Sequence, residues 1–345
     1  MNNPYSLTFG MEPKQLISRI VQQSQVIDNF TAENPSQYIY VVTGVRGSGK
    51  TVFLSDISNR LKAKDDWIVV ELNPLKDMLQ QLASKLSSID KYAKIFQKAK
   101  INLSFLGFGI EISGVSPITD IEMALEKMLT SLKEHGKRVL ITVDEVTNNE
   151  WVREFSLTYQ ILLRNNLPVF LLMTGLYENI SDLQNEKNLT FLYRAPKQLM
   201  TPLNIGAIAR NYLSNLKVDE ETAREMAMLT NGYSYAFQLL GYLTWEREGD
   251  YKAALDPYRQ YLDEYVYDKV WSELSPKDKK VLYGIATSKS PVVKDVREVL
   301  NMTTNEWNPY KKRLEKKGLI DGTTRGEVRL LLPMFDAYII ENYVI

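Results

Sequence analysis

The sequence predicts an α/β protein in which a parallel sheet is covered by helices on both faces and is followed by two helical regions. The first observation is that four apolar, β-branched runs alternate with helical stretches between residues 38 and 173. These runs lack the polar alternation of half-exposed strands, so they indicate strands that are buried on both faces. The second observation is that the chain after residue 203 carries helical patterns and, near its end, one short hairpin pattern.

The strands of the expected sheet lie at 38–43, 67–72, 138–143 and 168–173, and a shorter strand-like segment follows at 198–203. A capping sequence at 119–122 opens the helix before the third strand. The segment 101–113 alternates apolar and polar residues and contains Gly107 and Gly109, which predicts an inserted β-hairpin between helices.

Helices are expected over 205–216, 220–229, 233–248 and 257–274. Three more follow, capped from Ser275 and ending at Gly318, with a hairpin over 319–332. This order predicts a winged helix-turn-helix. Its third helix begins early if Thr303 caps it, or late if Asn308 does, and the sequence leaves both starts open. The expected domains are a core over 1–203, a helical lid over 204–271 and the winged helix over 272–345.

The composition and charge exclude several classes of protein. Of 345 residues, 44% are hydrophobic and 24% are charged, which excludes disordered, collagen-like and low-complexity chains. Because 42 Lys and Arg balance 42 Asp and Glu, no overall positive field draws the chain onto nucleic acid or anionic lipid. The sequence has no cysteine and a single histidine, His135, which excludes thiolate metal sites and argues against a Ser-His-Asp hydrolase.

The apolar runs give no sign of a membrane segment. The first residues lack the pattern of a signal peptide, and no run approaches the ~18 apolar residues that a membrane span requires. We therefore expect a soluble, cytoplasmic protein. His135 precedes Gly136 at a helix end and is expected to be a C-terminal cap residue.

A glycine-rich motif lies between the first strand and the following helix. It matches the pattern G-x-x-x-x-G-K-[ST], and the strand before it and the helix after it disfavour a chance glycine-rich turn. The backbone amides of such a loop point into one concavity that fits a β-phosphate, and the helix adds its positive end. The predicted ATP-binding residues are Gly44, Val45, Arg46, Gly47, Ser48, Gly49, Lys50, Thr51 and Val52. Lys50 is expected to reach the β- and γ-phosphates, and the Thr51 hydroxyl to bind Mg²⁺.

Two carboxylates follow the third strand, where open α/β sheets bind their ligands. Asp144 is the expected Mg²⁺ partner. Glu145 is the expected catalytic residue, because a second carboxylate can orient the attacking water or accept its proton. The alternative is that the acidic pair only caps a turn, and the nearby phosphate-binding motif makes that alternative the weaker one.

Two more residues are candidates for contact with a γ-phosphate. Thr174 ends the fourth strand and is a possible phosphate sensor, although its hydroxyl can equally bond to its own backbone. Arg194 could present its guanidinium to the phosphate in cis or across a subunit interface, and a surface ion pair is an equal alternative.

These motifs, the helical region after residue 203 and the terminal winged helix together resemble AAA+ ATPases of the archaeal-type group, which are related to origin-recognition initiators. The segment 3–19 is similar to the family's N-terminal segment, which implies that Phe9 and Ile17 contact adenine. The segment 231–240 is similar to the family's lid motif. Initiators usually carry a lid arginine that touches the γ-phosphate, and this chain has none between Asn231 and Trp245.

The third helix of the winged domain contains five basic residues and two acidic ones between 304 and 318. This modest excess favours double-stranded DNA as a partner, with contacts from the third helix and the wing. The alternative is a solvated or protein-facing surface. The candidate DNA-binding residues are Lys311, Lys312, Arg313, Lys316 and Arg325.

We therefore expect a switch that binds ATP or ADP, hydrolyses ATP, and couples nucleotide state to DNA or a partner, which can be another protein or a second copy of the chain in a homo-oligomer. A regulatory protein that holds nucleotide with little turnover is the second hypothesis. A P-loop kinase is the third, and the predicted lid helix argues against it because Arg247 is its only basic residue.

Overall fold

The computed structural model describes residues 2–8, 13–104, 107 and 112–343. The chain forms two compact units, and each is described by itself. The sheet unit comprises Ile20–Thr43 and Phe53–Gln198. The helical unit comprises Met1–Arg19, Gly44–Val52 and Leu199–Ile345.

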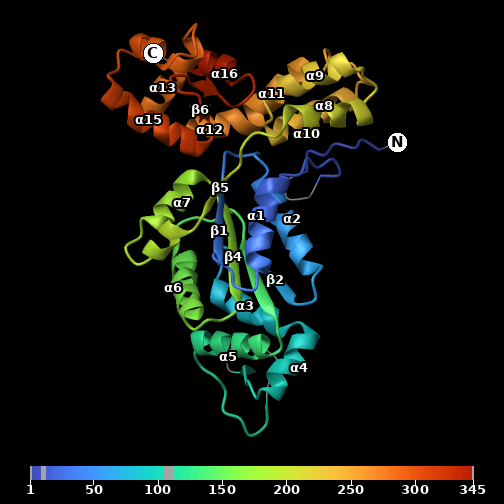
Figure 1. Ribbon diagram of the computed structural model, residues 1–345, viewed down its shortest axis with the longest axis vertical. Coiled ribbons are helices and arrows are strands. Elements are labelled where there is room, and N and C mark those ends of the chain that lie inside the picture. The colour runs from blue at the N-terminus through green and yellow to red at the C-terminus, as the bar shows by residue number, and fades with distance from the viewer. Residues whose placement is uncertain (1, 9–12, 105–106, 108–111, 344–345) are drawn as a thin grey trace. The chain divides into compact units, whose positions relative to one another are not determined.

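The sheet has five strands in the order β2-β3-β4-β1-β5. The pairs β2–β3, β3–β4 and β1–β4 are parallel, which confirms the predicted parallel α/β fold. Figure 1 shows these strands side by side with helices beside them. The fifth strand is three residues long, so the predicted strand over 198–203 ends early. The strands are β1 (Ile39–Thr43), β2 (Trp67–Leu72), β3 (Arg138–Val143), β4 (Val169–Gly175) and β5 (Lys197–Leu199).

Helices α2 to α7 lie between successive strands along the chain, as the sequence pattern predicts, and α1 precedes the first strand. Helix α2 begins at the glycine-rich motif and continues into this unit. Helix α7 is followed by a 3-10 helix at Thr190–Arg194. The helices are α1 (Ile20–Thr31), α2 (Lys50–Lys62), α3 (Met78–Ser87), α4 (Asp90–Lys98), α5 (Ile121–Glu134), α6 (Glu150–Arg164) and α7 (Tyr177–Gln184).

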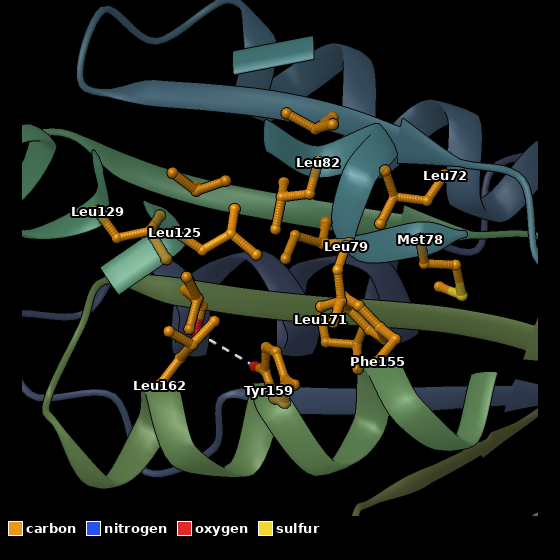
Figure 2. Close-up of a cluster of buried hydrophobic side chains, with 14 of the residues drawn as sticks. Leu72, Met78, Leu79, Leu82, Leu125, Leu129, Phe155, Tyr159, Leu162 and Leu171 are labelled. Carbon is orange, nitrogen blue, oxygen red and sulfur yellow. Dashed lines mark hydrogen bonds between the residues drawn. The ribbon is translucent and has the colours of Figure 1, made fainter. Parts of the chain in front are cut away.

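Both faces of the sheet are buried, which explains why its strands lack polar alternation. On one face, leucines of α3 and α5 and the aromatic residues of α6 pack against alternate strand residues (Figure 2). Tyr159 of α6 is fully buried there, and its hydroxyl donates to the carbonyl oxygens of Tyr38 (2.9 Å) and Val169 (3.2 Å). On the other face, Phe30 of α1 packs edge-on against Phe170, with ring centroids 5.1 Å apart.

The predicted hairpin over 101–113 is not confirmed. Its described residues, 101–104, 107 and 112–113, contain no strand, and the other residues of the segment lie outside the described part of the chain. The buried side chain of Asn102 instead closes this loop, because its amide donates to the carbonyl oxygens of Ile112 (3.3 Å) and Val115 (2.7 Å).

The helical unit contains the predicted helices after residue 203, and the predicted helix over 257–274 is broken by a π-helical turn at Asp263–Tyr267. Three helices and a two-stranded antiparallel ladder follow in the order of a winged helix, and α16 is a further helix that the sequence pattern did not predict. The elements are α8 (Ile205–Asn215), α9 (Glu220–Leu229), α10 (Ser234–Trp245), α11 (Leu255–Leu262), α12 (Asp268–Ser272), α13 (Pro276–Thr287), α14 (Val293–Leu300), α15 (Thr304–Lys317), β6 (Ile320–Asp321), β7 (Arg329–Leu330) and α16 (Phe335–Asn342).

Helix α15 takes the earlier of its two predicted starts. The hydroxyl of Thr303 accepts the N–H of Glu306, and the Glu306 carboxylate accepts the N–H of Thr303 at 2.8 Å. This capping box satisfies two N–H groups that the helix leaves open. Pro309 removes one bond farther along, to the carbonyl of Asn305, and the helix tolerates it because Asn305 is exposed to water.

One apolar core runs through the whole helical unit. The ring of Tyr267 packs at a tilt against that of Phe335 of α16, with centroids 4.8 Å apart, and Trp271 lies edge-on to Tyr338 at 6.2 Å. The expected boundary at residue 272 therefore crosses a continuous core. None of the helices in the described ranges has the length and apolar character that crossing a bilayer demands.

Candidate functional site

The glycine-rich motif forms a tight loop between β1 and α2. The N–H of Ser48 donates to the carbonyl oxygen of Val45 at 3.2 Å. Gly47 and Gly49 have φ angles of +71° and +90°, in the left-handed region that side chains with a Cβ rarely adopt. A Cβ on Gly47 would also lie 2.2 Å from the Tyr233 hydroxyl. The loop therefore needs glycine at both positions.

Lys50 begins α2 and turns back over the loop. Its ammonium donates to the carbonyl oxygens of Gly44 (3.0 Å) and Val45 (3.1 Å), and the residue is only 9% exposed. The motif thus places a mobile positive charge on a loop at the positive end of a helix. This combination suits a phosphate chain.

Three consecutive residues at the start of α10 bind three consecutive carbonyls of the same loop. The Tyr233 hydroxyl donates to Arg46 (2.5 Å), the Ser234 hydroxyl to Ser48 (3.0 Å), and the Tyr235 N–H to Gly47 (3.1 Å). Burial raises the pKa of Tyr233 well above its usual value, so its hydroxyl stays protonated and remains a donor. The loop is therefore fixed to the start of α10 through its backbone carbonyls.

The sheet unit brings Asp144, Glu145 and Thr174 together at the carboxyl ends of β3 and β4. The buried Thr174 hydroxyl donates to Asp144 Oδ1 and accepts the N–H of Glu145 at 3.2 Å. The N–H of Glu145 also lies 3.0 Å from Asp144 Oδ1. A hydrogen bond from Val146 to the Thr174 carbonyl (2.8 Å) closes the turn.

This arrangement distinguishes the roles open to the three residues. Because Thr174 directs its hydrogen to Asp144, its hydroxyl orients that carboxylate. Glu145 has a φ of +52° and an exposed side chain, so the turn presents a second carboxylate to solvent from a strained backbone.

The donors expected to hold Mg²⁺ have suitable chemistry. Thr51 supplies a hydroxyl and Asp144 a carboxylate, and Mg²⁺ prefers such oxygen ligands together with phosphate oxygens and water. The orientation of Asp144 by Thr174 is the kind of support that metal-ligating carboxylates usually have.

Three further residues are predicted to contact the nucleotide. Ile17 is half-buried and packs against the core of the helical unit, while Phe9 lies outside the described residues. Arg194 is exposed at the end of the 3-10 helix, beside the exposed Tyr193.

The five candidate DNA-binding residues fall into two groups. Arg313 binds the buried Asp278 of α13, with 3.0 Å from Nε to Oδ1, and Lys311 donates to the Gly322 carbonyl at 3.2 Å. These two side chains connect α15 to its neighbours. Exposed positions are held by Lys312 and Lys316 of α15 and Arg325 of the wing.

Other residues at the loop belong to predicted segments, but the sequence predicted no individual role for them. Tyr233, Ser234 and Tyr235 belong to the predicted lid motif, and Arg19 precedes α1. Arg19 donates to the Ser48 carbonyl at 3.1 Å and to the Ser234 hydroxyl at 3.3 Å. The sequence does show polar residues directly after Asn231-Gly232, where the preceding helix ends. Only the fold shows that these residues bind the loop.

Comparisons with known proteins agree with this architecture. Residues 27–169 match a family model described as an ATPase domain predominantly from Archaea, and residues 264–339 match a domain of unknown function. A Walker-type ATPase of Pyrococcus abyssi is similar in structure, with a TM-score of 0.63 and 16% identity over 94% of this chain and 96% of that one. The ORC2 protein of Aeropyrum pernix, solved in ADPNP and ADP complexes, gives a TM-score of 0.58 and 14% identity over 97% and 95%. No curated protein matches the chain.

Proposed function

We propose that this chain, which carries an archaeal-type ATPase domain, is a nucleotide-dependent switch that binds ATP with Mg²⁺, hydrolyses it, and transmits the nucleotide state to its C-terminal winged helix. The ATPase domain and the AAA+ fold support nucleotide binding. The A. pernix ORC2 protein, which shares this fold, was solved with nucleotides, and this supports the same class of ligand here.

The chain's residues divide the chemical work. Backbone amides of the loop 44–52 would surround the phosphates, and Lys50 would add a positive charge at the β- and γ-phosphates. Thr51 and Asp144 would hold Mg²⁺, which neutralises phosphate charge when bound. Glu145 would orient the water that attacks the γ-phosphorus and accept its proton, as the bond to the leaving ADP breaks.

Contacts between the phosphate-binding loop and the C-terminal part of the helical unit carry the proposal of a switch. Arg46 pairs with Glu273, just after α12, at 3.0 Å. Val45 packs against the core that contains the winged helix. A Cβ placed on Gly318, where α15 ends, would lie 3.6 Å from the backbone nitrogen of Val45.

Arg46 and Val45 therefore lie beside residues at the two ends of the segment α13–α15: Glu273 comes before α13, and Gly318 ends α15. Binding of a phosphate chain requires the loop to hold its amides around the ligand, so a change in loop shape is transmitted to Glu273 and to the end of α15. The loop is thus ion-paired with Glu273 and lies close to the residue that ends α15, so the coupling needs no long chain of intervening residues.

We propose duplex DNA as the partner of α15. Asn305, Asn308, Lys312 and Lys316 are all exposed and recur every three or four residues, so they share one face of the helix. Asn can bind adenine and Lys can bind guanine or phosphate, which are the contacts of a base-reading helix. Arg325, at the tip of the wing, would bind a flanking phosphate.

A protein partner is the second candidate, with little nucleotide turnover. The observation that favours it is that Lys311 and Arg313 are bonded within the domain, which leaves fewer charges for phosphates. DNA binding that weakens with salt supports the first candidate, whereas absence of such binding with and without ATP supports the second.

Substitution of Lys50 tests the nucleotide site. Lys50→Ala should abolish tight ATP binding, because it removes the flexible cation of the loop, and calorimetric titration with Mg²⁺ and ATP measures the loss. Lys62→Ala, at the exposed far end of α2, is the matched control and should bind as the wild type does. Unchanged affinity of the Lys50→Ala protein would contradict the assignment of the site.

A further inference from the structure

Arg19 joins three parts of the helical unit that are far apart in sequence. Its guanidinium donates to the carbonyl oxygen of Thr201, to the carbonyl oxygen of Ser48 at 3.1 Å, and to the hydroxyl of Ser234 at 3.3 Å. Ser234 itself donates to the Ser48 carbonyl at 3.0 Å. Arg19, Ser234 and Ser48 therefore form a closed set of hydrogen bonds between the N-terminal segment, the lid and the phosphate-binding loop.

The hydrogen-bond partners that the described part of the chain gives Arg19 are all uncharged. All three of its acceptors are neutral oxygens, and across residues 2–8, 13–104, 107 and 112–343 no carboxylate forms an ion pair with it. The side chain is half-buried, and desolvation lowers the pKa of Arg19 to about 10. A shielded cation with neutral partners is costly unless an anion completes its surroundings.

The lid helix provides no cation of its own at this place. Helix α10, with the sequence SYAFQLLGYLTW, contains no charged residue. Arg19 therefore brings a positive charge to the first turn of α10, which has none. Its bond to Ser48 places this charge beside the loop that carries Lys50.

We propose that Arg19 is a positioning residue of the nucleotide site: it fastens the phosphate-binding loop at Ser48 to the start of α10, and its charge favours a bound phosphate chain. This inference rests on the proposed nucleotide binding. It predicts two separable effects, one on affinity through charge and one on the lid through hydrogen bonds.

Two substitutions of Arg19 separate these effects. Arg19→Gln removes the charge, so ATP affinity should fall by about tenfold or more at low salt, equivalent to about 1.4 kcal/mol. The difference from the wild type should narrow between about 50 mM and about 500 mM NaCl, because salt screens the charge. Arg19→Lys keeps the charge and loses the planar fork, so its ATP affinity should stay within about threefold of the wild type while amides in the first turn of α10 exchange faster with solvent.

Controls distinguish this inference from the function on which it rests. Arg210→Gln makes the same change at an exposed arginine of α8 and should leave ATP affinity unchanged. If Lys50→Ala loses binding and a folded Arg19→Gln protein binds as the wild type does, the role of Arg19 is overturned while the site stands. If both variants bind normally, the proposed nucleotide site is wrong.

If Arg19→Gln does not fold, Arg19→Lys tests the positioning role of Arg19 by itself. Unchanged amide exchange at the start of α10 in Arg19→Lys would overturn the positioning role. Faster exchange there, with ATP affinity retained, would support it. Ser234→Ala removes the two bonds of the same set that involve the Ser234 hydroxyl, and it should also speed exchange at the start of α10, without the salt-dependent loss of affinity.

Discussion

Glu145 occupies an unusual backbone conformation for its residue type. A left-handed φ at a residue other than glycine costs about 1–3 kcal/mol, and Asp144 and Thr174 hold it by accepting its N–H. Such strain persists where surrounding bonds impose it, and it occurs often at active sites. The turn fixes the direction in which the Glu145 carboxylate leaves the chain.

Glu145→Gln tests whether that carboxylate takes part in hydrolysis. The amide keeps the shape of the side chain and cannot accept a proton, so ATP binding should persist while turnover falls by ~10²-fold or more. Phosphate release measured at saturating ATP gives the turnover. Glu150→Gln, at an exposed glutamate in the first turn of α6, is the matched control. Equal turnover in the Glu145→Gln and wild-type proteins would remove Glu145 from the mechanism.

At the scale of single residues, the sequence indicates which residue types the candidate site contains, but not which residues they form hydrogen bonds with. The spacing from Gly44 to Thr51 predicts a phosphate-binding loop, because the pattern requires particular residue types at its first and last three positions. The use of Thr174 to orient Asp144 could not be predicted, because two residues thirty positions apart meet only when β3 and β4 pair. The ion pair of Arg313 with Asp278 could not be predicted for the same reason, since Asp278 is on another helix.

At the scale of elements, the predicted ends of helices and strands are correct where local sequence signals fix them. They are wrong where a contact between distant residues fixes the end of the element. The predicted strands over 67–72 and 138–143 have the observed ends, because apolar runs and flanking polar residues fix them. The π-helical turn at Asp263–Tyr267 gives no such local signal. The aromatic spacing in this region continues a helical pattern, while the packing of Tyr267 against Phe335 belongs to the tertiary core.

Helix α15 yields a prediction about DNA. Reversal of both Lys312 and Lys316 to Glu should abolish binding to duplex DNA, because their exposed face would then repel phosphates, and ATP affinity should be retained. Fluorescence anisotropy with labelled duplex at several salt concentrations measures this, and each lost phosphate contact should reduce the slope of log affinity against log salt by ~0.9.

The control for this experiment changes the same charge elsewhere in the helical unit. Lys217→Glu with Lys252→Glu reverses two exposed lysines in the connections around α8–α9 and α10–α11. If both double variants lose DNA binding equally, the effect reflects overall charge and α15 is not the DNA-binding face. If the wild type shows no salt-sensitive binding, the partner is a protein.

At the scale of the whole molecule, the exposed Arg194 raises the question of assembly. Its side chain is available to reach a nucleotide held by a second copy, so Arg194→Ala should lower turnover only under conditions in which the protein assembles. Mixing it with the Lys50→Ala protein should restore activity at mixed interfaces, since each partner supplies what the other lacks. A loss that is independent of protein concentration, without rescue on mixing, would place Arg194 in cis or in a structural role.

The fold class follows from pattern alone, but the grouping of the chain into units does not. The glycine-rich loop is contiguous in sequence with β1 of the sheet unit, yet residues 44–52 group with the lid and the winged helix. The hydrogen bonds of Tyr233, Ser234 and Tyr235 to loop carbonyls account for this grouping. No local sequence signal encodes such bonds between segments nearly two hundred residues apart.

Hydrogen exchange measured by mass spectrometry tests whether nucleotide bound at the loop changes the winged helix. The wild-type protein is compared without nucleotide, with ADP, and with a slowly hydrolysed ATP analogue, and Lys50→Ala serves as the control that does not bind. We predict that ATP analogue changes amide protection in the loop and also around Glu273 and at the end of α15, and that Lys50→Ala shows neither change. Changes confined to the loop, with nucleotide binding established by calorimetry, would contradict the proposal that the nucleotide state is transmitted to the winged helix.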